Sequence, residues 1–419
     1  MKKEDKNLKL YPKYRQLSMD FLFFYTINVL FLTQVKHINM SAVLLVDTFY
    51  ALFVIMCTVP ASIIVGKIGR KKGMILGNLC NIIYLILVMN STNLLQLILA
   101  EITCALAFGL KDIAEPSILN ASINYSNEEK SNIFAKIQGK AVSGYYVLSA
   151  ISLILSGFLY EINGYIPISL TLTIVIITLI ISTRFQDVKE ISKVEDENNL
   201  EVSLKEAIKF AFSSKRCKSL LIFSAVCYSI ITVLGTYEIS LLEDLGVSSK
   251  YIGIMFAILN IVSSISSKKQ NIFQNKFKNR TLTILGILLS LSCVCAGIAT
   301  YFKINILFVL TIILIMYMIK YAMVGLYNVL LIKYLSNFTN SSIDTRIFAI
   351  NNFLSSVLSV IFGLFASCLL NVMEISMAMV MFGTISLLII IFILLYMRKR
   401  VGLEPKQYSE LELKYEVKL

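Results

Sequence analysis

Long apolar runs alternate with short polar segments along most of the chain. A helix that spans a bilayer needs about 20 mostly apolar residues, and about twelve runs have that character. This pattern predicts an all-α membrane protein with twelve transmembrane helices. The predicted spans are 17–37, 42–66, 73–90, 94–116, 138–160, 165–184, 219–242, 250–267, 281–300, 304–330, 347–370 and 375–397.

One longer polar segment interrupts this rhythm near the middle of the chain. Residues 186–218 begin with an acidic stretch, after which Ser203 to Phe212 has the pattern of a short amphipathic helix. We therefore predict a six-helix bundle over 1–185, a cytoplasmic linker over 186–218, a second six-helix bundle over 219–397 and a cytoplasmic tail over 398–419.

An internal repeat supports two related halves. The tripeptide Ile133-Phe134-Ala135 recurs as Ile347-Phe348-Ala349, and Gly109-Leu110 recurs as Gly325-Leu326. Both matches have nearly the same offset, about half the chain length, and each pair occupies similar positions in its run. The two bundles are therefore expected to be pseudo-symmetric.

Basic residues mark one side of the membrane. They concentrate at the N-terminus, in the turn from Lys67 to Lys72, in the 186–218 segment and in every second loop thereafter. By the positive-inside rule, this distribution predicts a cell (inner) membrane protein with both termini in the cytoplasm. The formal net charge of +13 lies in these loops, so it argues for membrane topology, with lipid as a partner, and against nucleic-acid binding.

Composition narrows the function further. The chain is 57% hydrophobic, its mean hydropathy is +0.76, and abundant Ile, Asn and Lys suggest a bacterial source. Nearly all of the eight cysteines lie in apolar runs, and His37 is the sole histidine, so we expect no metal site and no cofactor. Neither a Walker loop nor a catalytic arrangement stands out, so we expect a protein that is not an enzyme.

A basic turn at 60–77 carries a family resemblance. Gly69, Arg70 and Lys71 match the end of the signature between the second and third helices of the major facilitator superfamily, and Lys67 keeps a basic charge within it. Gly66 replaces the signature's aspartate. The chain thus resembles a transporter of that superfamily, which implies the two-bundle fold, alternating access, a small-molecule substrate and a monomer. The resemblance also implies that the residues of the basic turn, Lys67, Gly69, Arg70 and Lys71, take part in gating.

The fourth run contains three carboxylates that are candidates for proton relay or cation recognition. Glu101, Asp112 and Glu115 fall within about 60° of one another at ~100° per residue. An ionisable group inside a span is a functional candidate by default. The alternative for Glu101 is a structural hydrogen bond, and for the other two it is pairing with Lys111 or Lys140 at the inner interface.

Lys320 in the tenth run shares a helix side with Tyr317. It could bind an anionic group, neutralise a carboxylate across a cavity, or snorkel to the interface. The family's cavity is lined by the first, fourth, seventh and tenth helices, so the resemblance adds Asn28, Tyr228 and Glu238 to the candidates, although Glu238 could be an interface carboxylate. Asp20 and Asp47 are expected to be interfacial or paired.

Together these features predict a secondary active transporter for a small organic solute. We expect proton-coupled efflux, with Glu101 or the carboxylates below it binding the proton. A nutrient-uptake symporter and a transport-inactive membrane scaffold or sensor remain alternatives.

Overall fold

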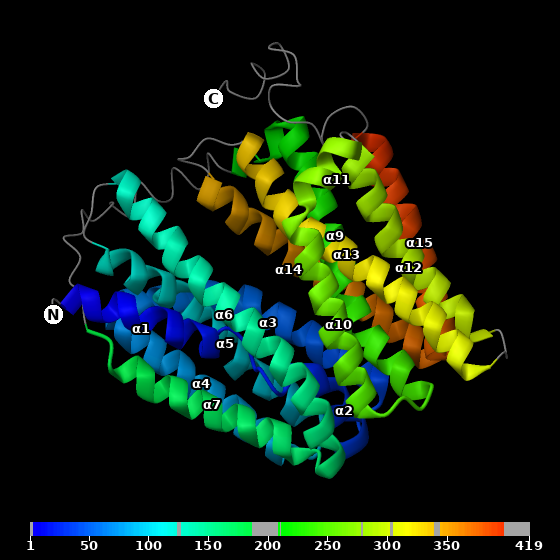
Figure 1. The fold of residues 1–419 in the computed structure, drawn as a ribbon, viewed down its shortest axis with the longest axis horizontal. Coiled ribbons are helices and arrows are strands. Elements are labelled where there is room, and N and C mark those ends of the chain that lie inside the picture. The colour runs from blue at the N-terminus through cyan, green and yellow to red at the C-terminus, as the bar shows by residue number, and fades with distance from the viewer. Residues whose placement is uncertain are drawn as a thin grey trace. The chain divides into compact units, whose positions relative to one another are not determined.

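The computed structural model describes residues 3–123, 127–186, 208–209, 211–277, 280–301, 305–338 and 344–397. The segments 187–207 and 398–419 lie outside it, so the expected linker helix at 203–212 falls mostly, and the tail entirely, beyond the described residues. All regular elements among the described residues are helices (Figure 1).

The first compact unit comprises Met1–Ser192 together with Leu245–Ala257. Its helices are α1 (Lys3–Ser18), η1 (Tyr25–Ile27), α2 (Asn28–Leu30), η2 (Phe31–Val35), α3 (Met40–Ile68), α4 (Arg70–Asn90), α5 (Leu94–Ser122), α6 (Asn127–Ile162) and α7 (Tyr165–Thr183), with the first half of α10.

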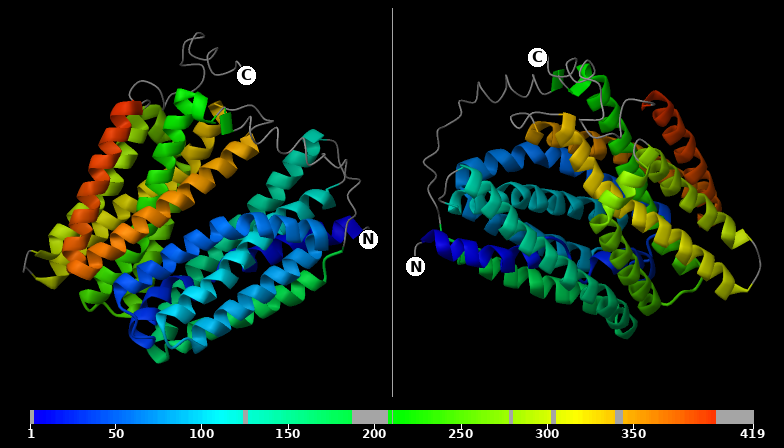
Figure 2. Two further views of the ribbon diagram at one scale, coloured as in Figure 1. Left: turned by 180° about the vertical axis from the view of Figure 1, so that it is seen from behind. Right: turned by 45° about the horizontal axis from the view of Figure 1, so that its top comes forward.

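The second compact unit comprises Lys193–Asp244 and Ile258–Leu419. Its helices are α9 (Lys215–Asp244), the second half of α10 (Ser249–Lys268), α11 (Gln270–Phe277), α12 (Thr281–Tyr301), α13 (Ile306–Phe338), α14 (Asp344–Val372) and α15 (Ile375–Met397). Figure 2 shows the same helices from two further sides.

Eleven of the described helices are long and apolar enough to cross a membrane, and they coincide with the predicted runs from the second to the twelfth. Large apolar side chains such as Leu95, Leu388 and Phe392 are exposed on them, at 65%, 66% and 75%. Side chains of this kind need an apolar solvent outside the bundle, which a bilayer provides. The first predicted run consists of several short helical pieces instead of one long helix. Together with it, the chain has the twelve crossings of the predicted fold.

The prediction of one continuous helix over 17–37 is wrong. The helix α1 starts at Lys3 and ends at Ser18, and the chain then bends before the short pieces η1, α2 and η2. The carboxylate of Asp20 accepts a hydrogen bond from the backbone N–H of Phe21, at 2.7 Å, and both Phe24 and Tyr25 donate to the carbonyl of Phe21. Such local bonds compete with the helical ladder, and they stop the helix at this point.

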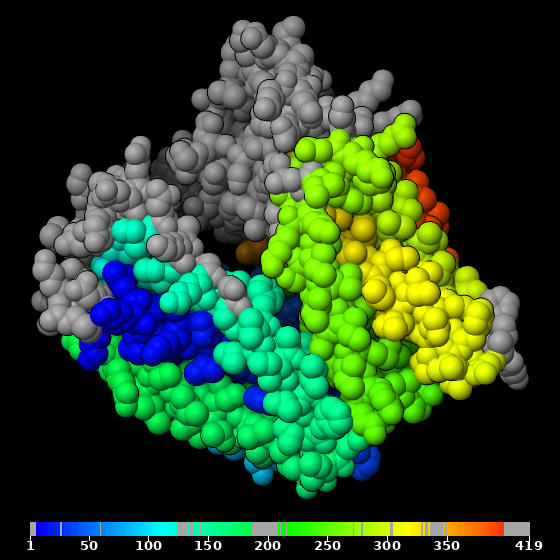
Figure 3. All heavy atoms as spheres, viewed as in Figure 1, coloured from blue at the N-terminus to red at the C-terminus, as the bar shows by residue number. Residues whose placement is uncertain are grey.

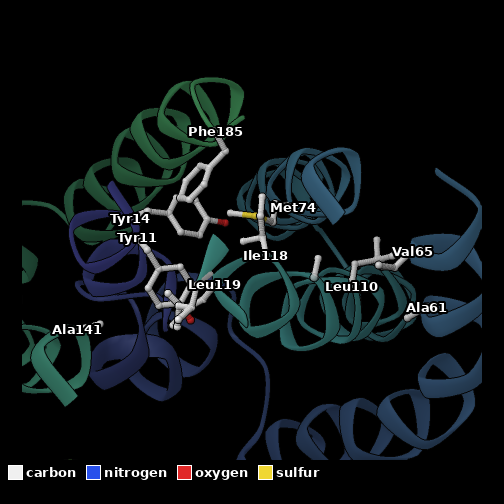
Figure 4. Close-up of a cluster of buried hydrophobic side chains, with 12 residues drawn as sticks. Tyr11, Tyr14, Ala61, Val65, Met74, Leu110, Ile118, Leu119, Ala141 and Phe185 are labelled. Atoms are coloured by element: carbon white, nitrogen blue, oxygen red, sulfur yellow. The ribbon is translucent and has the colours of Figure 1, made fainter. Parts of the chain in front are cut away.

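The polar start of α1 belongs to the bundle. Asn7 donates to Ser122 at the end of α5, and further along Ser18 donates to Glu115, so α1 runs antiparallel to the last turns of α5. Tyr11 and Tyr14 are fully buried in an apolar cluster with Ile118 and Leu119 of α5 (Figure 4). Hydropathy scores these residues as a polar leader, whereas aromatic packing places them beside a membrane span.

The basic turn has the predicted hairpin form. A single residue, Gly69, separates α3 from α4, and its φ of 88° is one that residues with a side chain rarely adopt. Lys67 and Lys72 are exposed beside it. In the second unit the corresponding connection, between α10 and α12, contains the eight-residue helix α11.

The internal repeat has a structural counterpart in each unit. Gly109 of α5 faces α3, where its missing Cβ would lie 3.3 Å from the Cβ of Ala61. Gly325 of α13 faces α10, where a Cβ would collide with the carbonyl of Ser263. In both halves a glycine thus lets the fourth crossing helix approach the second closely.

Candidate functional site

Each unit contains buried charged side chains that are candidate functional groups, and Glu115 of α5 is the first of them in the first unit. Its side chain is fully buried and forms an ion pair with Arg15 of α1. Tyr14 and Ser18, also on α1, donate hydrogen bonds to it at 2.9 and 3.2 Å. The alternative in which Glu115 pairs with Lys111 or Lys140 is wrong, because α1 packs against the end of α5 and supplies Arg15 as the partner.

This network extends across the unit. Asn78 of α4 donates to the hydroxyl of Tyr14 at 2.9 Å and accepts from Thr178 of α7 at 3.3 Å. All three side chains are buried, with at most 1% exposed. One set of hydrogen bonds therefore ties α1 directly to α4 and α5, and through Asn78 to α7, so moving α1 would break polar contacts to two helices and disturb a third.

Lys111, one helical turn before Glu115, is a second buried cation. Its ammonium donates to the backbone carbonyl of Ser18, the last residue of α1, and lies 4.9 Å from the centre of the Phe108 ring. In the second unit Tyr327, which follows Gly325-Leu326 as Lys111 follows Gly109-Leu110, donates to the carbonyl of Ser224 at 3.0 Å. The repeat therefore preserves this contact to the first crossing element while changing its charge.

Asp20 lies where α1 ends. Besides its bond to Phe21 N, it accepts a hydrogen bond from the hydroxyl of Tyr145 on α6 at 3.2 Å. Of the two alternatives expected for Asp20, an interfacial position or a paired one, the structure matches the paired one.

Glu101 lies nearer the other end of α5 and has a different environment. It is 6% exposed, and Tyr84 of α4 donates to it at 3.1 Å. The Tyr84 ring stacks on Phe21 at 5.3 Å. Among the described residues, the buried ion pairs are Arg15–Glu115 and Lys320–Glu238, so Glu101 belongs to neither. Asp47 of α3 is close enough to act on it electrostatically.

In the second unit, α9 and α13 contribute one buried ion pair. Lys320 donates to Glu238 at 2.9 Å, and their side chains are 3% and 2% exposed. Tyr317 donates to the backbone carbonyl of Glu238 at 3.4 Å, and the Lys320 ammonium lies 4.5 Å from the ring centre of Tyr321. Of the alternatives for Lys320, this geometry matches neutralisation of a carboxylate.

The remaining predicted residues are not gathered with these. Asp112 is exposed, and it lies between Glu101 and Glu115, whose partners are on α4 and α1 respectively, so the three carboxylates do not meet at one point. Tyr228 is 45% exposed on α9, and Asn28 is partly buried at the start of α2.

Arg15, Tyr14 and Asn78 were missed by sequence reasoning. Arg15 lies in a lysine-rich segment, and in a membrane protein such a segment is typical of a cytoplasmic loop. The signal that was available is the spacing of Asn7, Tyr11, Tyr14 and Ser18, which recurs every three or four residues as one face of a helix.

Within the described residues, histidine, cysteine and acidic side chains form no group of three that could hold a metal ion. The site consists instead of buried charges and tyrosines within bundles of apolar helices. Together these features define a polytopic α-helical membrane protein with polar groups inside each bundle, an arrangement typical of transporters.

Comparison with known proteins gives the family. The family model of the Major Facilitator Superfamily matches residues 17–363, and the chain belongs to this superfamily of transporters. No curated protein sequence matches it.

Solved structures share the fold at low sequence identity. The nucleoside transporter NupG is 12% identical, with a TM-score of 0.71, over 96% of this chain and 100% of that one. A D-xylose–proton symporter is 12% identical, with a TM-score of 0.70, over 97% and 99%. A bacterial homologue of the human lysosomal transporter Spinster is 13% identical, with a TM-score of 0.66, over 99% and 97%.

Proposed function

We propose that the protein is a secondary active transporter that moves a small organic solute across the cell membrane by alternating access of its two bundles. In this proposal a proton gradient supplies the energy, the solute leaves the cell, and the Lys67–Lys72 turn faces the cytoplasm. Membership of the superfamily supports transport as the activity, and the fold of the neighbours supports a bundle-rocking mechanism.

The observation that carries proton coupling is the environment of Glu101. Burying an ionised carboxylate without a counter-ion is costly, and binding a proton removes that cost. Glu101 has a tyrosine hydroxyl and a nearby carboxylate as neighbours, and it takes no part in the buried ion pairs of the described residues. A carboxyl in this setting is suited to load and release a proton as its surroundings change.

The experiment begins with an accumulation screen in cells that express the protein, with and without a proton uncoupler. The panel contains amphipathic dyes, sugars, nucleosides and dipeptides. For a solute that responds, Glu101→Gln is expected to abolish uncoupler-sensitive transport while leaving counterflow exchange in proteoliposomes intact. Glu161→Gln removes an exposed carboxylate at the end of α6 and is the matched control, which should transport normally. Full gradient-driven transport by Glu101→Gln would exclude Glu101 from coupling.

The second candidate is uptake of a nutrient. It is favoured by the similarity in fold to a D-xylose–proton symporter and a nucleoside transporter. The direction is decided by the same screen: an uncoupler raises cellular accumulation of an exported solute and lowers that of an imported one. A protein without solute flux in any arm would instead support the membrane scaffold or sensor.

A further inference from the structure

The end of α1 inside the first unit has the character of a cation site. The last four carbonyl groups of a helix lack partners within it, and the helix dipole adds partial negative charge there. In α1 these carbonyls belong to residues 15–18, at the level of α5 where Lys111 and Glu115 lie. The Ser18 carbonyl is directed to the Lys111 ammonium.

The charges around this ammonium are unequal. The carboxylates of Glu115, Asp112 and Asp20 all act on Lys111, while Arg15 is the single other cation that does so among the described residues. Arg15 is already bound to Glu115, so Lys111 is the cation left to act on both Asp112 and Asp20. Without Lys111, Arg15 would be the one cation left among the described residues to act on these carboxylates, so a positive charge at this position is favourable.

The path of the lysine stem is built into the neighbouring helix. Lys111 is only 2% exposed, and its Cγ lies 2.7 Å from the place where a Cβ on Gly77 of α4 would stand. Gly77 therefore leaves a slot through which the side chain reaches the end of α1. The Phe108 ring covers the ammonium from another side.

We propose that the break after α1 is a binding site for a monovalent cation, which the protein fills with its own Lys111 ammonium. A backbone carbonyl and an aromatic face in direct contact, with carboxylates nearby, are groups that bind Na⁺, K⁺ or an ammonium ion. The ammonium holds the end of α1 against α5 and keeps the break in place. At this position the protein carries its own cation, and a variant without the ammonium binds one from solution.

The test is the melting midpoint of purified full-length Lys111→Met in NaCl, KCl or NH₄Cl against choline chloride at equal ionic strength. Methionine keeps an unbranched stem and removes the charge. The variant is expected to melt below the wild-type protein in choline chloride and to regain stability saturably as one of the small cations is added. The wild-type protein should show no such difference between salts.

Lys36→Met provides a matched control. Lys36 also binds backbone carbonyls at a helix end, those of Met89 and Ser91 at 2.6 and 3.0 Å. Its other contacts among the described residues are with aromatic side chains and not with a carboxylate. Its loss should lower stability equally in every salt. The proposal is overturned if Lys111→Met also melts at the same temperature in all four salts.

A second variant covers the case in which Lys111→Met does not fold. Gly77→Ala displaces the lysine stem sterically while retaining the ammonium, so it should give a smaller dependence on the same cations. Gly66→Ala, at a position with no atom within 4 Å of an added Cβ, should give none. If Gly77→Ala has a lower melting midpoint than the wild-type protein but the same midpoint in every salt, the cation site is ruled out. All readouts are of stability, so they stand apart from the transport test of Glu101.

The surface around this site is shown in Figure 3, where α1 lies at the surface between α6 and α7 in this view. The Lys111 ammonium lies beneath that surface, and the exposed lysines of α1, Lys6, Lys9 and Lys13, lie outside the site. A saturable, cation-specific response distinguishes binding at the vacated position from general screening of these exposed charges by salt.

Discussion

Two buried glutamates occupy comparable places in the two units and have opposite electrostatic surroundings. Glu101 is seven residues from the start of α5 and Glu238 six residues from the end of α9, so each lies about 10 Å from a helix end at 1.5 Å per residue. Glu238 is bound to the Lys320 ammonium, whereas Glu101 is bound to the Tyr84 hydroxyl. One carboxyl is therefore neutralised by a fixed cation, and the other needs a proton to become neutral.

This difference separates structural from functional expectations. Breaking a buried ion pair leaves an uncompensated charge and is strongly destabilising. Neutralising a carboxyl that has no cation leaves no such charge behind. The first change should damage the fold, and the second should damage the transport cycle.

The largest effect is expected for Lys320→Met, which leaves Glu238 buried without its cation. We expect a loss of about 3–5 kcal/mol in unfolding free energy, measured by thermal unfolding in detergent. The double variant Glu238→Met/Lys320→Met, with no charge left to bury, should recover most of that loss. If the double variant is as unstable as the single one, the pair contributes packing rather than charge compensation.

An intermediate effect is expected for Arg15→Met. Glu115 would lose its cation but keep the hydroxyl donors of Tyr14 and Ser18, and the Arg15 side chain is 15% exposed, so water reaches it. The loss should be about 2 kcal/mol, the range for one hydrogen bond to a charged group, in the same unfolding measurement. Lys13→Met, an exposed lysine on the same helix, is the control that should leave stability unchanged. A loss as large as that of Lys320→Met would mean that the hydroxyl donors contribute little.

The smallest effect on stability is expected for Glu101→Gln. The amide oxygen still accepts the Tyr84 hydrogen bond, so the unfolding free energy should change by less than about 1 kcal/mol. Glu238→Gln, which would leave Lys320 without its carboxylate, should cost several times more. Equal losses in these two variants would remove the contrast between the two glutamates.

Hydropathy alone was sufficient to place the crossing helices from the second to the twelfth, and the basic turn at Gly69 was predicted with its hairpin form. Both depend on local signals, namely run length, charge placement and a glycine in a short turn, where the structure has a positive φ. The Gly-Leu repeat also had structural meaning, because each glycine marks a close approach between two helices of its own unit.

The partners of the charged residues could not be predicted in the same way. Arg15 and Glu115 are 100 positions apart, and Lys320 and Glu238 are 82 apart. Helical spacing gives the side of one helix on which a residue lies, but not which neighbouring helix meets that side. The start of the first crossing helix could not be predicted for a related reason. Hydropathy scores Tyr14 and Arg15 as though they were solvated by water, whereas their polar partners in the structure are Asn78 and Glu115.

The early start of α1 has a practical consequence for work with this protein. A hydropathy plot marks the residues before Met19 as a dispensable leader, which is where truncations are made and affinity tags are joined. Deletion there would remove the counter-charge of Glu115 and the aromatic side chains that close one side of the first bundle. Expression vectors for this protein should therefore keep the N-terminal residues and carry the tag at the opposite end of the polypeptide.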